Sequence, residues 1–274
     1  MFDSIAGDYD ALNHILSLDV DKLWRKKALK QIVDAPAPAR VLDLACGTGD
    51  FSIAIAKALS RSHKRVGTPI EAHVKAPAKA PVEAPAKAPV EAQVTSTGFV
   101  TGDSGRSDLM TKGHVTGVDL SEGMLAVMRE KVQKAGLTEM ISIEEGDGEN
   151  LRFPDNTFDR VTIAFGIRNF ENKEKGLREM LRILKPGGRL VILELSRPEN
   201  KIIRWFYDLY FLHILPKIGG KVSGDKAAYA YLPASVAAFP GKKAFMATMR
   251  EAGFRTVTHK AFTLGICRMY TGEK

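Results

Sequence analysis

The stretch Val41–Asp50, with the sequence VLDLACGTGD, decides the fold of this chain. Apolar residues surround one carboxylate and lead directly into a turn with two glycines, and the helix-like run Phe51–Ala56 follows. A buried parallel strand, a tight loop and a helix N-terminus in this order hold nucleotide-like cofactors in α/β folds. The stretch therefore predicts a cofactor site, and by itself it leaves the cofactor open.

Two kinds of cofactor loop compete here. A dinucleotide-binding loop requires the pattern G-x-G-x-x-G, and this chain has Ser52 in place of the third glycine. The carboxylate in the strand would repel a pyrophosphate and suits a ligand that carries an ammonium group. The pattern resembles the first motif of class I methyltransferases, which bind S-adenosylmethionine, and a glycine-containing loop without a ligand is the simpler alternative. The residues predicted to bind the cofactor here are Asp43, Gly47, Thr48 and Gly49.

The composition limits the class of protein. The chain has 274 residues, of which 45% are hydrophobic and 26% charged, as is ordinary for a soluble globular protein with a proper core. A net charge of +8 suits nucleic acid or an anionic membrane surface, but no stretch combines basic and aromatic residues as base-reading proteins do. We therefore expect no nucleic-acid partner. Cys46 and Cys267 are too few for a disulfide framework or a metal site.

The chain lacks the sequence signals of export. Acidic residues occur in Met1–Asp8, where a signal peptide has basic and then apolar residues. No apolar run reaches the length that is needed to span a bilayer. We expect a cytoplasmic protein.

Residues 62–112 differ from the rest of the chain. Pro77–Ala84 is repeated letter for letter as Pro85–Ala92, and prolines every four residues exclude helix and sheet ladders. The tract has few large apolar residues, so we expect a disordered insertion within a single domain that spans 1–274.

Leaving this insertion out restores a familiar spacing. The strand His114–Asp119 ends in a carboxylate that lies 70 positions after Gly49, or 19 positions once the 51 inserted residues are excluded. Nucleotide-binding α/β units place a ribose-binding acid about 20 residues after the glycine loop. Asp119 is therefore predicted to bind the cofactor ribose, and a helix-capping or surface carboxylate is the alternative.

The remaining sequence alternates strands and helices. Further strands are predicted over Ile141–Ile143, Phe158–Phe165, Arg189–Leu195, Arg255–Ala261 and Gly265–Tyr270. Helices are predicted over Ser121–Ala135, Lys173–Leu184 and Gly241–Ala252, and a turn over Lys185–Gly188. This alternation predicts a doubly wound, mostly parallel seven-stranded sheet with its ligand over the carboxyl ends of the strands.

Two short segments at that edge carry further candidate residues. Asp147 and Gly148 follow the third strand, where a carboxylate accepts from the exocyclic amine of an adenine and glycine allows close approach; a simple Asp-Gly turn is equally compatible. Arg168 and Asn169 follow the fourth strand, where a fixed cation and an amide suit an oxyanion or a water beside the reacting groups. A salt bridge from the arginine to a loop carboxylate, such as Asp155 or Asp159, is the alternative.

Longer signatures make the resemblance specific. They are Tyr9–Asn13 with Leu16, Ser17 and Trp24; Arg182–Arg189 through Glu194–Ser196; Phe165–Asn169; and Phe153–Asp159. Together they are similar to the ubiquinone/menaquinone biosynthesis C-methyltransferases over nearly the whole chain except the insertion. The chain departs from that pattern at Leu12, Asp21 and Ala164.

The resemblance implies a reaction. It implies the class I fold and methyl transfer from S-adenosylmethionine to a ring carbon of a polyprenyl quinol, with demethylmenaquinol as the first expectation and a benzoquinol of the ubiquinone pathway as the alternative. Arg168, Asn169 and Tyr9 are then the expected catalytic residues, with Tyr9 closing over the ring. A nicotinamide-dependent oxidoreductase and a binding module without activity are more remote alternatives.

The polyprenyl tail of such a substrate needs an apolar route. The segment Ile202–Leu215 is rich in aromatic residues, and it is too short and too charged to span a bilayer. It suits a tail tunnel, a peripheral contact at the inner face of the membrane, or a helix that packs over the sheet edge. The resemblance also leaves a homo-oligomer open.

Overall fold

The computed structural model describes residues 19–35, 39–66, 113–210 and 226–274. For residues 62–66 and 226–230 it describes the backbone alone. Tyr9, the tract 67–112 and the last five residues of the aromatic segment, 211–215, lie outside these residues. Predictions about them remain predictions.

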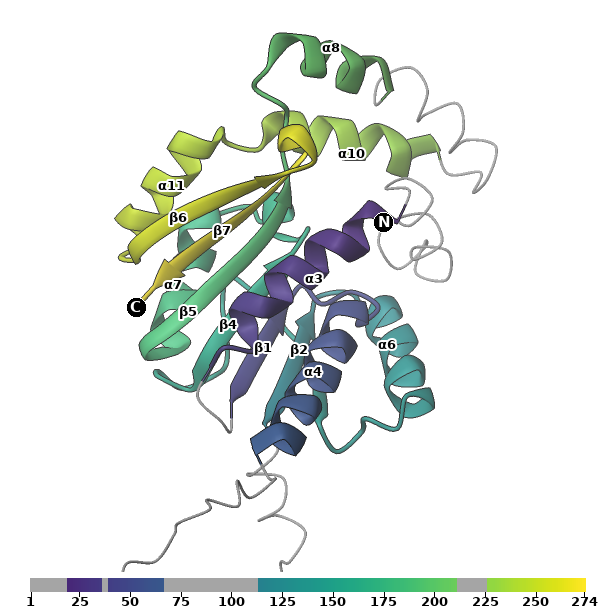
Figure 1. The fold of residues 1–274 in the computed structure, drawn as a ribbon, viewed down its shortest axis with the longest axis vertical. Coiled ribbons are helices and arrows are strands. Elements are labelled where there is room, and N and C mark those ends of the chain that lie inside the picture. The colour runs from purple at the N-terminus through teal and green to yellow at the C-terminus, as the bar shows by residue number, and fades with distance from the viewer. Residues whose placement is uncertain (1–18, 36–38, 67–112, 211–225) are drawn as a thin grey trace, which may run out of the picture.

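The described residues form one seven-stranded sheet in the order β3-β2-β1-β4-β5-β7-β6 (Figure 1). β7 is antiparallel to both of its neighbours, and every other pair of neighbours is parallel. The strands are β1 (Arg40–Leu44), β2 (His114–Asp119), β3 (Ile141–Glu145), β4 (Phe158–Ala164), β5 (Leu184–Leu195), β6 (Arg255–Phe262) and β7 (Cys267–Glu273). The predicted class I architecture is confirmed.

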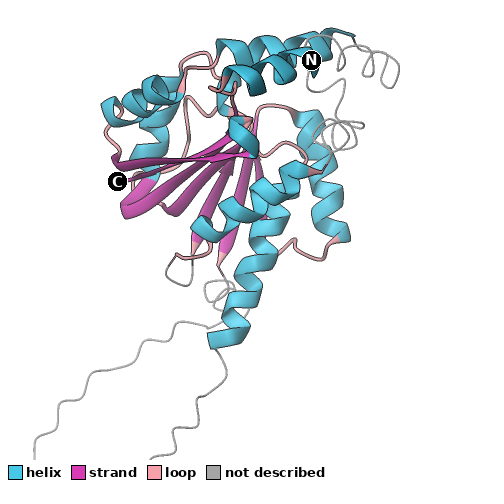
Figure 2. Cartoon of the chain, turned by 45° about the horizontal axis from the view of Figure 1, so that its top comes forward, coloured by secondary structure: helices cyan, strands magenta, loops and turns pink. Residues whose placement is uncertain are grey.

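Helices cover both faces of the sheet, as Figures 1 and 2 show. α3 (Val20–Ile32), α4 (Asp50–Val66) and α6 (Glu122–Lys134) pack on one face, and α7 (Lys173–Ile183) and α11 (Lys242–Glu251) on the other. Side chains of a strand alternate between faces. Val41 therefore packs in the apolar cluster under α3, α4 and α6, and Leu42 and Leu44 pack in the cluster under α7 and α11. This double burial explains the nearly continuous apolar run of β1.

α8 (Lys201–Leu209) and α10 (Lys226–Ala238) lie beyond the carboxyl ends of the strands (Figure 1). A short 3-10 turn, η1 (Ile167–Asn169), contacts α10, and a second one, η3 (Thr263–Gly265), joins β6 to β7. No helix within the described residues is long and apolar enough to cross a membrane.

The local signals in the sequence were mostly confirmed. Ser121 caps α6 by accepting a hydrogen bond from the backbone N–H of Met124 at 3.2 Å, and Gly136 and Gly253 take left-handed φ angles of 65° and 110° where α6 and α11 end.

Several element boundaries differ from the prediction. The last strand was predicted over Gly265–Tyr270, and β7 covers Cys267–Glu273. α4 continues to Val66, so the irregular tract does not begin at residue 62. The predicted turn Lys185–Gly188 belongs to β5, where the pairing with β4 shifts between Phe158 and Arg160 and β5 bulges. A bulge accommodates extra residues without ending the strand, and the glycines at 187 and 188 permit it. Helices α3 and α10 were not predicted.

Candidate functional site

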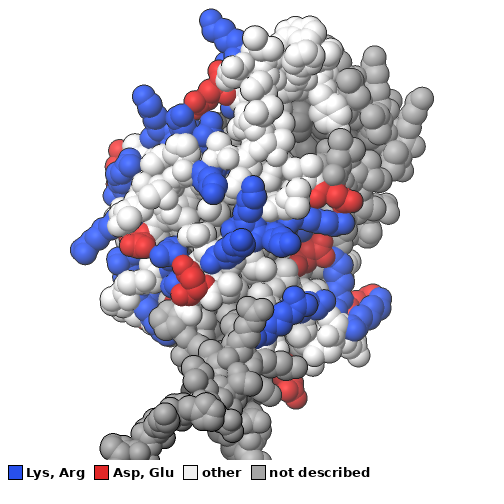
Figure 3. Space-filling model, viewed as in Figure 1, with Lys and Arg blue, Asp and Glu red and all other residues white. Residues whose placement is uncertain are grey.

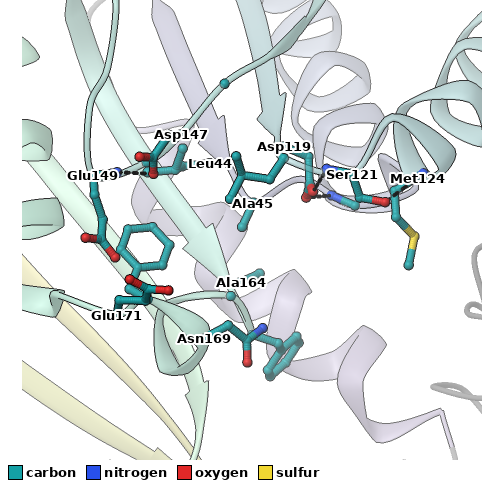
Figure 4. Close-up of a pocket in the computed structure, with 17 residues that line it drawn as sticks. Leu44, Ala45, Asp119, Ser121, Met124, Asp147, Glu149, Ala164, Asn169 and Glu171 are labelled. Atoms are coloured by element: carbon teal, nitrogen blue, oxygen red, sulfur yellow. Dashed lines mark hydrogen bonds between the residues drawn. The ribbon is translucent and has the colours of Figure 1, made fainter. Parts of the chain in front are cut away.

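A cavity of about 510 Å³ opens at the carboxyl ends of β1 to β4 (Figure 4). Its walls come from the segments that follow these four strands, within residues 44–47, 119–124, 146–149 and 164–171. This is the edge at which a doubly wound sheet is expected to bind its ligand, because the first and fourth strands lie side by side and their connections diverge to opposite faces.

The glycine loop after β1 forms part of the wall. Gly47 and Gly49 take φ angles of 55° and 82°, which favour glycine. A Cβ atom added to Gly47 would meet nothing within 4 Å, whereas one added to Gly49 would collide with the side chain of Met128 on α6. Gly47 thus leaves space at the cavity, and Gly49 allows α4 and α6 to approach each other.

Asp119 connects the first two walls. Its Oδ2 accepts a hydrogen bond from the backbone N–H of Gly47 at 2.8 Å, and its Oδ1 accepts one from the N–H of Ser121 at 2.9 Å (Figure 4). Ser121, not Asp119, caps α6. The carboxylate lines the cavity, in agreement with its predicted place at the tip of the second strand.

Three of the predicted cofactor residues lie beneath the loop instead of in the cavity wall. Asp43 is 1% exposed and accepts a hydrogen bond from Ser52 Oγ at 2.5 Å, because the alternation of β1 directs it toward α4. Thr48 is buried and accepts from Lys131 Nζ at 3.1 Å, and Gly49 packs on Met128. None of the three lines the cavity, so the prediction that they contact the ligand is not supported by their positions.

Burial changes the acidity of Asp43. Desolvation raises the pKa of its carboxyl from 3.8 to about 7, although the hydrogen bond from Ser52 and the positive charge of Arg25 act in the opposite direction. Ser52, which stands where a dinucleotide loop has its third glycine, is therefore the hydrogen-bond partner of the strand carboxylate.

Asp147 and Gly148 form the third wall. Asp147 Oδ1 accepts from the backbone N–H of Glu149 at 2.8 Å, so the predicted turn and the predicted place at the cavity are both realised (Figure 4). A Cβ atom on Gly148 would collide with the ring of Phe170. Glycine is needed here because the Phe170 ring, which also lines the cavity, occupies that space.

Arg168 does not line the cavity. Its side chain is 6% exposed and donates from Nη1 to Glu194 Oε1 at 2.9 Å, to the carbonyl oxygen of Phe165, and from Nε to Ser235 Oγ at 3.3 Å. The backbone N–H of Arg168 also donates to Glu194 Oε2, at 3.1 Å. The predicted alternative of a salt bridge is realised, with Glu194 of β5 as the partner instead of Asp155 or Asp159.

Asn169 lines the cavity, as predicted for a residue beside the reacting groups. Its Oδ1 accepts a hydrogen bond from the hydroxyl of Tyr231, on α10, at 2.9 Å. Because the amide oxygen is engaged with Tyr231, the amide NH₂ is the group of Asn169 that can donate to a ligand.

Phe165 holds the fourth wall in a strained conformation. Its φ angle is 62°, which is rare for a bulky residue, and its backbone N–H donates to the carbonyl of Leu193 at 2.8 Å. The ring lies 6.2 Å from the Trp24 ring, and the Arg25 guanidinium stands 5.7 Å from its centroid. The N-terminal helix α3 therefore supports this wall from outside.

The cavity is acidic. Among the 17 residues of the described part of the chain that line it are four carboxylates and no lysine, arginine or histidine; the acids are Asp119, Asp147, Glu149 and Glu171. Such a wall repels phosphates and attracts a cation. The described residues contain no cluster of three histidine, cysteine or acidic side chains that could hold a metal ion.

Sequence reasoning missed three residues of this site. Glu194 is part of a signature that the sequence analysis quoted, but no function was assigned to it there. Phe165 was named as part of the fourth strand and of a quoted signature, but without a role, and its left-handed backbone has no signal in the sequence. Tyr231 lies 62 positions from Asn169, in a helix that was not predicted, and only the fold brings the two together.

Comparisons with known proteins agree with this geometry. The model of the ubiE/COQ5 methyltransferase family matches residues 1–274. The chain is 41% identical over 274 residues to the "Ubiquinone/menaquinone biosynthesis C-methyltransferase UbiE" of Geobacter sulfurreducens, covering all of this chain and 87% of that protein. It is 37% identical to the "Demethylmenaquinone methyltransferase" of Bacteroides fragilis, covering all of this chain and 91% of that protein.

Among solved structures, a SAM-dependent methyltransferase of Thermotoga maritima, titled a possible histamine N-methyltransferase, matches with a TM-score of 0.55. It is 16% identical and is covered over 98% of its length by the whole of this chain. At this identity the likeness concerns the fold alone.

Proposed function

The chain belongs to the ubiE/COQ5 methyltransferase family, and we propose that it methylates a ring carbon of a polyprenyl quinol, with demethylmenaquinol as its substrate and menaquinol as its product. It is an enzyme that depends on S-adenosylmethionine. Several similar relatives carry the name demethylmenaquinone methyltransferase, which favours the naphthoquinol over a benzoquinol.

One observation carries the choice of cofactor: among the described residues, four carboxylates and no basic side chain line a cavity beside the glycine loop. S-adenosylmethionine carries a sulfonium and an ammonium group, so an acidic wall fits it, whereas a nicotinamide dinucleotide would bring a pyrophosphate against the same carboxylates. When bound, S-adenosylmethionine supplies an electrophilic methyl group. Asp119, Gly47, Asp147 and Gly148 are the residues that we assign to its site.

The acceptor side is assigned to the segment after β4. An aromatic carbon becomes a good nucleophile once a ring hydroxyl loses its proton, so the site must stabilise the resulting oxyanion. Asn169 suits this role because its NH₂ group can donate while Tyr231 holds its oxygen. Phe165 and Phe170 line the same wall and suit a flat apolar ring.

Arg168 receives a different role from the one that the sequence suggested. With its guanidinium buried between Glu194 and the Phe165 carbonyl, it fixes the backbone that presents Phe165 and Asn169. We therefore assign it as a positioning residue. Tyr9 stays a prediction, because it lies outside the described residues.

The substrate assignment is tested by methyl transfer from labelled S-adenosylmethionine to demethylmenaquinol and to the demethylated benzoquinol, side by side under reducing conditions. We expect labelled menaquinol, and Asn169→Ala should lower kcat by roughly 100-fold while cofactor affinity is retained, as when one oxyanion donor is removed. Glu145→Gln, a change at an exposed residue outside the cavity wall, serves as the comparison and should leave kcat unchanged. If only the benzoquinol became labelled, the assignment would be reversed. If neither quinol became labelled, the assignment would be refuted.

A polyprenyl substrate resides in a membrane. We therefore also propose that the protein meets its substrate at a membrane surface, with the open end of the sheet directed toward the lipid.

A further inference from the structure

α8 presents an apolar face to solvent. Ile202, Trp205, Phe206 and Leu209 are exposed by 71%, 61%, 60% and 39%, and together they make up four of the seven exposed large hydrophobic residues in the described part of the chain. Their spacing of three, four and seven places them on one side of the helix. We call these four residues the α8 apolar face.

The opposite side of α8 is anchored to the protein. Tyr207 is buried, and Asp208 pairs with Arg197, whose Nη2 stands 2.5 Å from Oδ2. Asn200 caps the helix by accepting from the N–H groups of Ile202 and Ile203. The helix is therefore held in a fixed rotation that keeps its apolar face outward. In Figure 3 the surface at this end of the molecule is mostly that of uncharged residues, with Lys and Arg side chains beside it.

The charges around this face favour an anionic surface. Both acids beside α8 are paired with cations: Asp208 with Arg197, and Glu199 with Lys242 at 2.7 Å. Within the described residues, Lys201 has no acidic partner, and it lies at the margin of the apolar face. Arg204 lies on the anchored side, where its Nε donates to the carbonyl of Pro198 at 2.8 Å. An amphipathic helix with aromatic residues on one side and a cation at its margin is typical of helices that lie in a lipid interface.

α8 stands at the end of the molecule that holds the cavity. α8 follows the carboxyl end of β5 in the chain (Figure 1). β5 lies beside β4 in the sheet, and the segment after β4 forms the acceptor side of the cavity. An element that touches lipid at this end would bring the cavity to the membrane in which a polyprenyl tail lies. This step rests on the proposed function.

A second copy of the chain fits the face less well. Four side chains of this size expose roughly 500 Å², since a large aromatic side chain contributes about 150–250 Å² when it is wholly free. A stable dimer buries about 800 Å² on each partner. The face is too small for a dimer and large enough for a shallow insertion into lipid.

We propose that α8 is a membrane-docking element, whose apolar face inserts into the headgroup region of an anionic lipid bilayer while Lys201 contacts a lipid phosphate. Trp205 then moves from water into lipid when the protein docks. Trp24, the other tryptophan of the chain, stays in the protein core, where it is 5% exposed.

This difference between the two tryptophans gives a direct test. The full-length protein is titrated with vesicles of phosphatidylcholine mixed with phosphatidylglycerol, with and without brominated acyl chains. We expect a blue shift of the tryptophan fluorescence, quenching by the brominated lipid, and co-sedimentation with the vesicles. Trp205→Phe should keep the co-sedimentation and lose both fluorescence changes.

Matched variants locate the docking element. The double variant Ile202→Gln with Phe206→Gln should bind the vesicles about tenfold or more weakly, because two large apolar side chains no longer enter the lipid. Leu23→Gln, a change at a residue of α3 that is 58% exposed, should bind as the parent does. Raising the salt concentration, or omitting phosphatidylglycerol, should weaken binding.

Three results would overturn the proposal. They are no vesicle binding by the parent protein, equal binding by the double variant, and a blue shift that appears without lipid as protein concentration rises, since the last result indicates a second copy on the face. None of these readouts requires methyl transfer, so they separate failure of docking from failure of the proposed reaction. Circular dichroism of the double variant checks that its fold is retained.

Discussion

Asp119 shows how one carboxylate organises two walls of the cavity. It accepts from two backbone N–H groups, so both of its oxygens are directed before any ligand arrives. We expect Asp119→Asn to weaken binding of S-adenosylmethionine by about 10–100-fold, since hydrogen bonds to a charged group contribute about 1.5–3 kcal/mol. Isothermal titration measures this directly.

The adjacent strand supplies a control. Glu145 pairs with Asp119 in the sheet register but is exposed and lies outside the cavity wall. Glu145→Gln removes the same charge from nearly the same place and should leave cofactor affinity within about twofold, because an exposed charge is screened. Equal losses for the two variants would show that Asp119 acts only through overall charge.

Asp43 makes stability depend on pH. The folded protein holds its proton more tightly than the unfolded chain, because burial raises its pKa from 3.8 to about 7. This contribution to stability is complete below a pH of about 3.8 and is lost as the pH rises through about 7. We expect Asp43→Asn, which keeps an acceptor for Ser52, to gain stability relative to the parent over that window. Urea unfolding across the window tests it, and parallel curves for the two proteins would contradict it.

At the scale of elements, the glycine loop separates ligand binding from packing. Both glycines have positive φ angles, which cost an alanine about 1–3 kcal/mol. Gly47 faces open space at the cavity, so Gly47→Ala should lose cofactor affinity by more than its small loss of stability explains. Gly49→Ala must also displace Met128, and we expect the larger loss of stability. Thermal unfolding with and without cofactor distinguishes them, and the reverse ranking would contradict this assignment.

The contact between η1 and β5 is a buried ion pair. Arg168→Met leaves the Glu194 carboxylate, which is 0% exposed, without its cation, and we expect a loss of about 3–5 kcal/mol in the free energy of unfolding. Adding Glu194→Gln should recover part of this loss, because no buried charge then remains. Urea unfolding of the two single variants and the double variant measures the coupling between the two residues. Additive losses of stability would contradict a stabilising ion pair between Arg168 and Glu194.

The elements show which parts of the site the sequence could predict. Residues at strand ends, such as Asp119 and Asp147, were placed at the cavity because parallel strands bring their carboxyl ends to one edge. Asp43 was predicted to bind the cofactor, and the structure places it on Ser52 of α4, outside the cavity wall; a strand that is buried on both faces does not reveal which way each side chain points. The hydrogen bond between Tyr231 and Asn169 joins segments that are distant in the sequence, and no local sequence pattern predicts it.

For the whole molecule, the doubly wound, mostly parallel seven-stranded sheet was predicted from alternating strand and helix patterns once the proline-rich tract was set aside, and the order of its strands came from the structure. The signals that succeeded were local: caps, glycines at helix ends and strand periodicity. Tertiary placement had no such signal: α10 was not predicted, and the sequence did not indicate that Arg168 pairs with Glu194 of β5. The reaction required more than the fold, because sheets of this type carry methyltransferases with different acceptors.

The central claim is that the acidic cavity at the end of β1 to β4 holds S-adenosylmethionine and delivers its methyl group to a quinol ring carbon. Its most direct test supplies S-adenosylmethionine with a deuterated methyl group and demethylmenaquinol to the purified protein, and locates the label by mass spectrometry and NMR. We predict menaquinol with the intact deuterated methyl on the ring carbon, and little product from Asp119→Asn at limiting cofactor. A label on a quinol oxygen, or an unlabelled quinol, would contradict the claim.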